Sequence, residues 1–245
     1  MWKMKVVYRR PSPPWVMAIR EKSTANLDYQ RQRLCGIPEV VLASDKNPED
    51  VAHFLQQLAH ECGFSFATRV DEACFLTIKE LSRSLKYVLK YYPRARIAYL
   101  KKKEVVFRPH CGPVGILSAG TSDLPVAEEA RVTLEILGCK VMYAYDVGVA
   151  GVHRLQKPLE KMQEKKVSCY VVIAGREAAL PTLVKALVDV PVIGVPTSCG
   201  YGYGRGGESA LMSILQSCSP GVVCVNIDNG FGAACAAYLI AKRVR

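Results

Sequence analysis

The residues best suited to chemistry lie in glycine-rich loops in the second half of this 245-residue chain. These loops comprise residues 118–123, 146–151, 174–177, 196–207 and 226–232. Asp123, Asp146 and Glu177 are carboxylates in these loops that could take part in chemistry. Backbone N–H groups of such loops bind phosphate where a helix begins, and a carboxylate can orient or deprotonate water. The loops therefore predict a site for a phosphate-bearing ligand.

The elements that must position these loops are short apolar strands alternating with helices. Strands are expected over residues 114–118, 140–145, 170–174, 192–195 and 222–226, with helices over 126–137, 154–164, 178–188, 207–215 and 232–242. This alternation indicates a parallel sheet covered on both faces, with every loop at the carboxyl edge. The predicted class is α/β, a flavodoxin-like three-layer sandwich preceded by a small α/β N-terminal domain.

Three parts are expected along the chain: an irregular tail over 1–24, the small domain over 25–110, and a catalytic domain over 111–245. In the small domain Asn47 is expected to cap a helix that starts at Pro48. Its buried face would comprise Val51, Phe54, Leu55 and Leu58. Strands are expected over 39–43 and 64–70, a helix over 71–91, and a hairpin of 96–100 with 104–107.

The composition favours a protein that is neither secreted nor membrane-bound. No apolar run reaches the roughly 18–20 residues that cross a bilayer. The 10 cysteines are scattered without a CxxC pair, so we expect reduced thiols and a cytoplasmic location. A transit peptide stays open as an alternative, because Arg9, Arg10 and Arg20 precede the first acidic residue, Glu21.

The net charge of +11 is concentrated in the first part of the chain. Residues 1–110 hold 20 Lys and Arg against 11 Asp and Glu, a net charge of +9. A solvated basic surface is the favoured interpretation. Nucleic acid ranks last among the partners, although Lys101–Lys103 lie near Tyr91, Tyr92 and Tyr99, because no nucleic-acid motif is present.

Several loops resemble the motifs of one enzyme family. Residues 118–129, 146–155, 196–198, 200–202, 206–207 and 226–234 are similar to motifs of the nickel-pincer cofactor carboxylase/hydrolase family, the LarB-type pyridinium-3,5-biscarboxylic acid mononucleotide synthases. Cys199 and Arg205 depart from the family's pattern. Residues 25–28, 31, 35–36 and 38–41 resemble that family's N-terminal segment. The resemblance covers about residues 25–245. The second half is also similar, more distantly, to the aminoimidazole ribonucleotide carboxylases and mutases.

The resemblance implies a specific reaction. Nicotinic acid adenine dinucleotide would be carboxylated at ring position 5, with carbon dioxide or bicarbonate as co-substrate. Its pyrophosphate would then be hydrolysed, giving the dicarboxylated mononucleotide and AMP. No tightly bound cofactor is expected, magnesium is a candidate for the hydrolysis, and the family implies a symmetric homo-oligomer.

A cysteine nucleophile is the central residue that the resemblance implies. Cys218 matches the family's nucleophile, and Cys199 in the loop 196–207 is its competitor. Glu177 matches the glutamate of the hydrolysis, although a glutamate there could also complement the helix dipole. Asp123 and His153 complete the catalytic candidates, with helix capping or a structural role as their alternatives.

The candidate substrate-binding residues share the loops described above. They are Ser118, Gly120, Thr121, Ser122, Asp146, Gly148, Gly151, Arg154, Gly175, Ser198, Gly200, Gly207 and Asn229. Two other functions remain open at this point: an aminoimidazole ribonucleotide carboxylase or mutase, whose chemistry needs no thiol, and a non-catalytic protein that binds nucleotides or nucleic acid.

Overall fold

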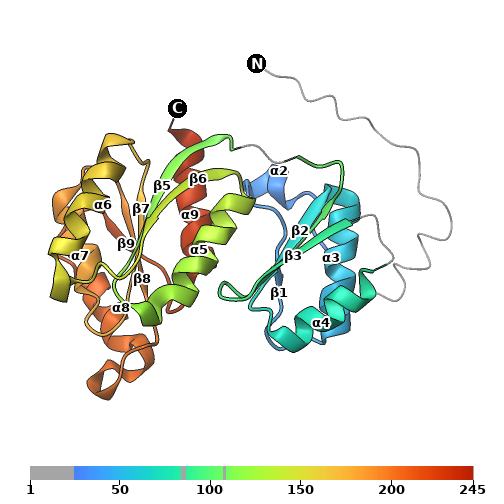
Figure 1. Cartoon of the computed structure of the whole chain (residues 1–245), viewed down its shortest axis with the longest axis horizontal. Helices are drawn as coiled ribbons and strands as arrows, with labels where there is room; N and C mark the ends of the chain where they lie inside the picture. The colour runs from blue at the N-terminus through green and yellow to red at the C-terminus, as the bar shows by residue number, and fades with distance from the viewer. Residues whose placement is uncertain (1–24, 84–86, 107–108, 245) are drawn as a thin grey trace.

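The computed structural model describes residues 25–83, 87–106 and 109–244. The tail expected over residues 1–24 lies outside them. Helices and sheets alternate in layers across the molecule (Figure 1). In the described part of the chain, no helix is both long enough and apolar enough to cross a membrane.

The N-terminal domain is a four-stranded sheet with helices on one face. Its elements are α2 (Arg31–Cys35), β1 (Val41–Leu42), α3 (Pro48–Cys62), β2 (Phe64–Thr68), α4 (Glu72–Leu81), β3 (Tyr87–Tyr92) and β4 (Ile97–Lys102). The strand order is β1-β2-β4-β3, with β1 and β2 parallel and the other pairs antiparallel. Helices α3 and α4 share one apolar core with this sheet.

The helix predicted after Asn47 is confirmed. The Asn47 side chain accepts a hydrogen bond from the Glu49 N–H at 3.0 Å, and Pro48 occupies the first turn, where its missing N–H costs nothing. Every apolar residue expected on the inner face is buried, namely Val51, Phe54, Leu55 and Leu58.

Two predictions for the N-terminal domain are wrong. The helix expected over 71–91 ends at Leu81, and residues 87–92 form β3 instead. The hairpin pairs β3 with β4 and turns at 93–96, so Lys101 and Lys102 belong to a strand and not to a tip. Pairing with β4 along its whole length stabilises Tyr87–Tyr92 in the extended conformation.

The same pairing occupies the aromatic rings considered for nucleic-acid contact. Tyr91 stacks on Phe75 with ring centroids 4.2 Å apart, and its hydroxyl donates to the Val70 carbonyl. Tyr99 is buried, and the Lys101 ammonium donates to the Val105 carbonyl at 2.6 Å. These groups stabilise the domain itself and are not free to stack on bases.

The second domain has the predicted flavodoxin-like architecture. Its strands are β5 (Cys111–Ser118), β6 (Cys139–Ala144), β7 (Tyr170–Ala174), β8 (Val192–Pro196) and β9 (Val222–Cys224). All pairs are parallel, in the order β6-β5-β7-β8-β9. Helices α5 (Leu124–Ile136) and α9 (Gly230–Arg243) cover one face, and α6 (His153–Glu164), α7 (Ala179–Leu187) and α8 (Glu208–Leu215) cover the other.

The two domains share a core through α5 and α9. Phe66 and Ile97 of the N-terminal sheet are fully buried and pack in one cluster with Val132 and Ile136 of α5 and with Phe231 of α9. The α5–α9 layer therefore lies between the two sheets, as Figure 1 shows. This packing fixes the N-terminal sheet relative to the parallel sheet.

Gly230 of α9 lies tightly against α5, so a substitution at this position tests the packing of the shared layer. A Cβ at Gly230 would collide with the Val126 carbonyl oxygen and lie 2.9 Å from Glu129 Oε2. We expect Gly230→Ala to lower the free energy of unfolding by about 1–3 kcal/mol through overpacking, measured by urea denaturation followed by circular dichroism. Gly204→Ala is the matched control, because nothing lies within 4 Å of its added Cβ. Equal stability of the two variants would contradict this packing.

Candidate active site

A cavity of about 580 Å³ lies at the carboxyl edge of the parallel sheet. The loops that follow β5, β6, β7 and β8 form its walls. The predicted residues that line it are Gly120, Ser122, Asp123, Gly148, Arg154, Gly175 and Glu177. The fold thus brings together residues that are up to 57 positions apart in the chain, because the carboxyl ends of parallel strands meet at one edge of the sheet.

Asp123 ties three of these loops together. Its carboxylate accepts from the Thr197 hydroxyl at 2.7 Å and from the Gly120 N–H at 2.8 Å, and the Gly175 N–H also donates to it. Burial raises the pKa of Asp123, and these donors oppose the rise. Its side chain does not cap α5, so the capping alternative gives way to a role in holding the loops.

Glu177 lies in the cavity wall and is exposed to solvent. It precedes the N-cap of α7, Ala178, so it is not in the first turn as the dipole interpretation required. Within the described residues no hydrogen bond or ion pair occupies its carboxylate. Arg176 beside it lies over the Tyr201 ring, with 5.1 Å from the guanidinium carbon to the ring centroid. A free carboxylate in the wall of such a cavity can position water next to a bound ligand.

Other predicted residues support the loops and do not line the cavity. The Ser118 hydroxyl accepts from the Asp146 N–H at 3.4 Å, and Asp146 forms an ion pair with Arg154. Asn229 caps α9 by accepting from the Gly232 N–H at 2.7 Å. The same turns contain Thr121, Gly151, Gly200 and Gly207. Gly207 has a φ of 101°, and a Cβ added there would lie against the Thr197 carbonyl.

His153 lies outside the cavity. It is the first residue of α6, and the turn over Val149–Gly151 directs Arg154 toward the cavity and His153 toward a different surface depression, formed with Leu187. Within one chain, the structure therefore does not bring His153 next to Asp123 or Glu177.

Cys218 is exposed but also lies away from the cavity. It lies in the connection from α8 to β9, before the strand begins, whereas the ligand loops follow the strands. Its neighbours Ser217 and Ser219 hydrogen-bond to Thr182 of α7 at 2.8 and 3.2 Å. The cysteine in the cavity wall is Cys199, whose thiol donates to the Ser122 carbonyl at 3.2 Å, and burial raises the pKa of that thiol.

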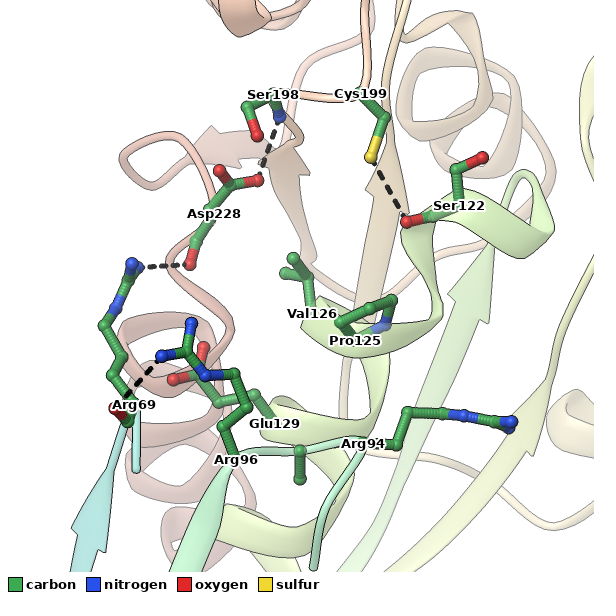
Figure 2. A pocket seen from close by; sticks show the side chains of 11 residues that line it. Arg69, Arg94, Arg96, Ser122, Pro125, Val126, Glu129, Ser198, Cys199 and Asp228 are labelled. Atoms are coloured by element: carbon green, nitrogen blue, oxygen red, sulfur yellow. Dashed lines mark hydrogen bonds between the residues drawn. The ribbon is translucent and has the colours of Figure 1, made fainter. Parts of the chain in front are cut away.

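A second cavity, of about 230 Å³, lies between the two domains (Figure 2). Ser122, Ser198 and Cys199 contribute to it from the ligand loops, and Ser122 and Cys199 also line the first cavity. Its remaining polar lining is Arg69, Arg94, Arg96, Glu129 and Asp228. Sequence reasoning missed these arginines, and the only signal was the positive charge of residues 1–110.

No group of three or more His, Cys, Asp and Glu side chains is placed to hold a metal ion within the described ranges. A magnesium requirement therefore stays an expectation that the assay must address.

An open parallel sheet with a polar cavity outside the carboxyl ends of its strands defines the class of α/β proteins whose ligand sites lie at this edge. Residues 113–244 match the AIR carboxylase family, and residues 19–103 match the LarB/PurE-like N-terminal domain. The chain belongs to the AIR carboxylase family. The two domains together indicate an enzyme of the carboxylase or mutase kind.

Relatives match most of the chain or about half of it. An uncharacterized protein of Methanocaldococcus jannaschii is 45% identical over 217 residues, which is 88% of this chain and 83% of the relative. The N5-carboxyaminoimidazole ribonucleotide mutase of Pyrococcus horikoshii is 34% identical over 136 residues, 54% of this chain and 71% of the relative. The phosphoribosylaminoimidazole carboxylase of Candida glabrata is 32% identical over 147 residues, 57% of this chain and 24% of the relative.

The raised pKa of Asp123 predicts a pH dependence of stability. The unfolded state releases this proton near pH 3.9, below the folded pKa, so wild type loses stability relative to Asp123→Asn as pH rises between the two values, by about 1.4 kcal/mol per pH unit at most. In Asp123→Asn an amide nitrogen replaces Oδ2 and cannot accept from the Gly120 N–H. Loss of this hydrogen bond lowers the free energy of unfolding of the variant by the same amount at every pH.

Urea unfolding of wild type and Asp123→Asn at pH 4 to 7 measures this slope. Asp45→Asn is the surface control, because Asp45 is exposed at a φ of 60° that asparagine also adopts. If both variants follow wild type in parallel, burial does not raise the pKa of Asp123.

Proposed function

We propose that this protein carboxylates the pyridinium ring of nicotinic acid adenine dinucleotide at position 5 and hydrolyses its phosphoanhydride. The products are pyridinium-3,5-biscarboxylic acid mononucleotide and AMP. The observation that carries the proposal is the unpaired Glu177 carboxylate in a cavity built from glycine-rich loops, in a chain with a LarB/PurE-like N-terminal domain. Loop amides suit the phosphates, and Glu177 suits the water of the hydrolysis.

The carboxylation requires a thiolate because a pyridinium ring is electron-poor and its position 5 does not attack carbon dioxide. Addition of the thiolate at position 4 forms a C–S bond and converts the ring to a dihydropyridine. Position 5 now has enamine character and forms a C–C bond with carbon dioxide. A base then removes the proton from position 5, the C–S bond breaks with its electron pair returning to sulfur, and the ring becomes aromatic again.

Cys218 can supply this thiolate only from a second copy of the chain. It precedes β9, the edge strand of the sheet, so it lies at the periphery of its own subunit. Exposed apolar side chains surround this edge, with Met212, Leu215 and Val223 at 58%, 67% and 52% exposure. Such a surface suits burial in a symmetric homo-oligomer, in which the Cys218 of one subunit reaches the cavity of the next.

Cys199 is the alternative source of the thiol within one chain. Its thiol donates to the Ser122 carbonyl, and burial raises its pKa. Both effects reduce the thiolate fraction, and the thiolate is the nucleophile. Cys218 therefore remains the proposed nucleophile.

Two substitutions should separate the two chemical steps. Nicotinic acid adenine dinucleotide is incubated with bicarbonate, with magnesium or EDTA, and the products are identified by mass spectrometry. Cys218→Ser should form neither product, while Cys199→Ser stays active. Glu177→Gln should still add one carboxyl group but release AMP about 10²–10⁴-fold more slowly, as expected for loss of a general base. Absence of both products from the wild-type protein would reject the proposed function.

Mixing the two inactive variants tests whether one site uses two chains. Mixed oligomers of Cys218→Ser and Glu177→Gln contain sites with an intact cysteine from one subunit and an intact glutamate from another. We expect the mixture to complete the reaction that neither variant completes alone, measured as AMP released per minute. Each variant reassembled by itself is the control. No gain on mixing would place both residues in the same chain's site and contradict delivery from a second copy.

The placement of Cys218 also favours a second candidate, aminoimidazole ribonucleotide carboxylase or mutase activity. That ring carbon is already nucleophilic and needs no thiol, and relatives of the second domain have these names. Turnover of a carboxylated aminoimidazole ribonucleotide by Cys218→Ser at the wild-type rate would establish this alternative.

A further inference from the structure

The interdomain cavity and the carboxyl-edge cavity share one wall. Ser122 and Cys199 line both, and the Cys199 thiol donates to the Ser122 carbonyl across this wall. A ligand that occupies both cavities must therefore have two ends joined by a link over the Ser122–Cys199 pair. A dinucleotide has this construction, with a pyrophosphate between its halves.

Cationic side chains dominate the interdomain cavity. Arg69, Arg94 and Arg96 line it together with the carboxylates of Glu129 and Asp228, and the Asp228 carboxylate accepts from the Ser198 N–H at 2.9 Å. The ion pairs among the described residues involve none of these three arginines. Glu129 is buried, and its charge is partly satisfied by the Phe231 N–H at 3.1 Å. The charges of Arg69 and Arg96 act on Glu129 without an ion pair, and three guanidinium groups against two carboxylates leave the lining with a net charge of +1 that can attract an anion.

Two of the arginines converge, as Figure 2 shows. The Arg69 guanidinium donates to the Asp228 carbonyl at 2.9 Å, and the Arg96 guanidinium donates to the Arg69 carbonyl at 3.3 Å. Each guanidinium has five N–H donors, so each keeps donors for a ligand. Arg94 points away from this pair.

The volume of the interdomain cavity limits which part of a dinucleotide it can hold. About 230 Å³ is smaller than the roughly 300–1,000 Å³ of sites that enclose a whole drug-sized molecule. The cavity therefore suits the phosphate end of a ligand whose remainder extends outside it. Bidentate guanidinium donors match phosphate oxygens in geometry and charge.

We propose that Arg69 and Arg96 of the N-terminal domain bind the phosphate of the adenylate half of the dinucleotide. The pyridinium half then occupies the carboxyl-edge cavity, and the scissile phosphoanhydride lies over the Ser122–Cys199 wall. The assignment of the two halves rests on the proposed function. It gives the N-terminal domain a direct part in binding the substrate and retaining the AMP product.

Binding of AMP to the full chain tests the proposal without any need for turnover. Isothermal titration should show that Arg96→Gln and Arg69→Gln each weaken AMP binding roughly 10-fold to 100-fold, the effect of losing charge-assisted hydrogen bonds. Arg33→Gln is the matched control, since Arg33 is an exposed arginine of the same domain that bonds the Gln30 side chain. It should bind AMP as wild type does.

Arg96→Lys is the control that separates weaker binding from misfolding, because lysine keeps the positive charge and lacks the planar pair of guanidinium donors. It should bind AMP with intermediate affinity, and circular dichroism should match wild type. The proposal is overturned if wild type does not bind AMP, or if the Arg69 and Arg96 variants bind it unchanged.

The same variants keep this proposal distinct from the proposed function. If the Arg69 and Arg96 variants lose AMP affinity while wild type carboxylates no dinucleotide, the result supports the phosphate site and rejects the proposed reaction. If wild type carboxylates the dinucleotide and the variants change neither AMP affinity nor KM, the reaction stands and the arginine site falls.

Discussion

The buried carboxylate of Glu129 holds the parts of this molecule in register. It lies on α5, accepts from the Phe231 and Gly230 N–H groups at the start of α9, and faces Arg69 and Arg96 of the N-terminal domain. Burial raises the pKa of Glu129, and these donors and charges oppose the rise. A carboxylate this deep is tolerated only where such partners surround it. One side chain therefore bonds α5 to the start of α9 and interacts electrostatically with two arginines of the first domain.

The positions of both cavities depend on how α5 packs between the two domains. Because α5 begins directly after the loop of Ser122 and Asp123, fixing α5 between the two sheets also fixes the wall that the cavities share. On one side of the wall the sheet loops present amide groups and Glu177. On the other side the strand ends of the N-terminal domain present guanidinium groups. The N-terminal domain thus completes a binding surface that the flavodoxin-like domain begins.

Local sequence patterns predicted most of this architecture. Apolar strands such as Tyr170–Ala174 and the cap at Asn47 are determined by neighbours in sequence, and both are found where expected. The β3–β4 pairing was missed because Tyr87–Tyr92 is stabilised by cross-strand contacts that no local pattern encodes. The arginine cavity was missed for the same reason, since Arg69 and Asp228 are far apart in sequence and meet only through the shared α5–α9 layer. Motif matching named Cys218 but could not indicate that its side chain lies away from its own cavity.

The separation of Cys218 from Glu177 has a consequence for symmetry. If one subunit gives its thiol to a neighbour's cavity in a twofold pair, the contact is reciprocal, and each pair contains two composite sites. A head-to-tail contact would instead have to close into a ring to avoid an open filament. In either arrangement the thiol enters from outside the subunit, so the ring of the ligand must lie at the mouth of the carboxyl-edge cavity. The link to the adenylate half must then run inward over Ser122 and Cys199, toward the arginines at the domain junction. Under the proposed function, a nucleophile supplied from a second copy and a phosphate held by the first domain are therefore two requirements of one extended ligand.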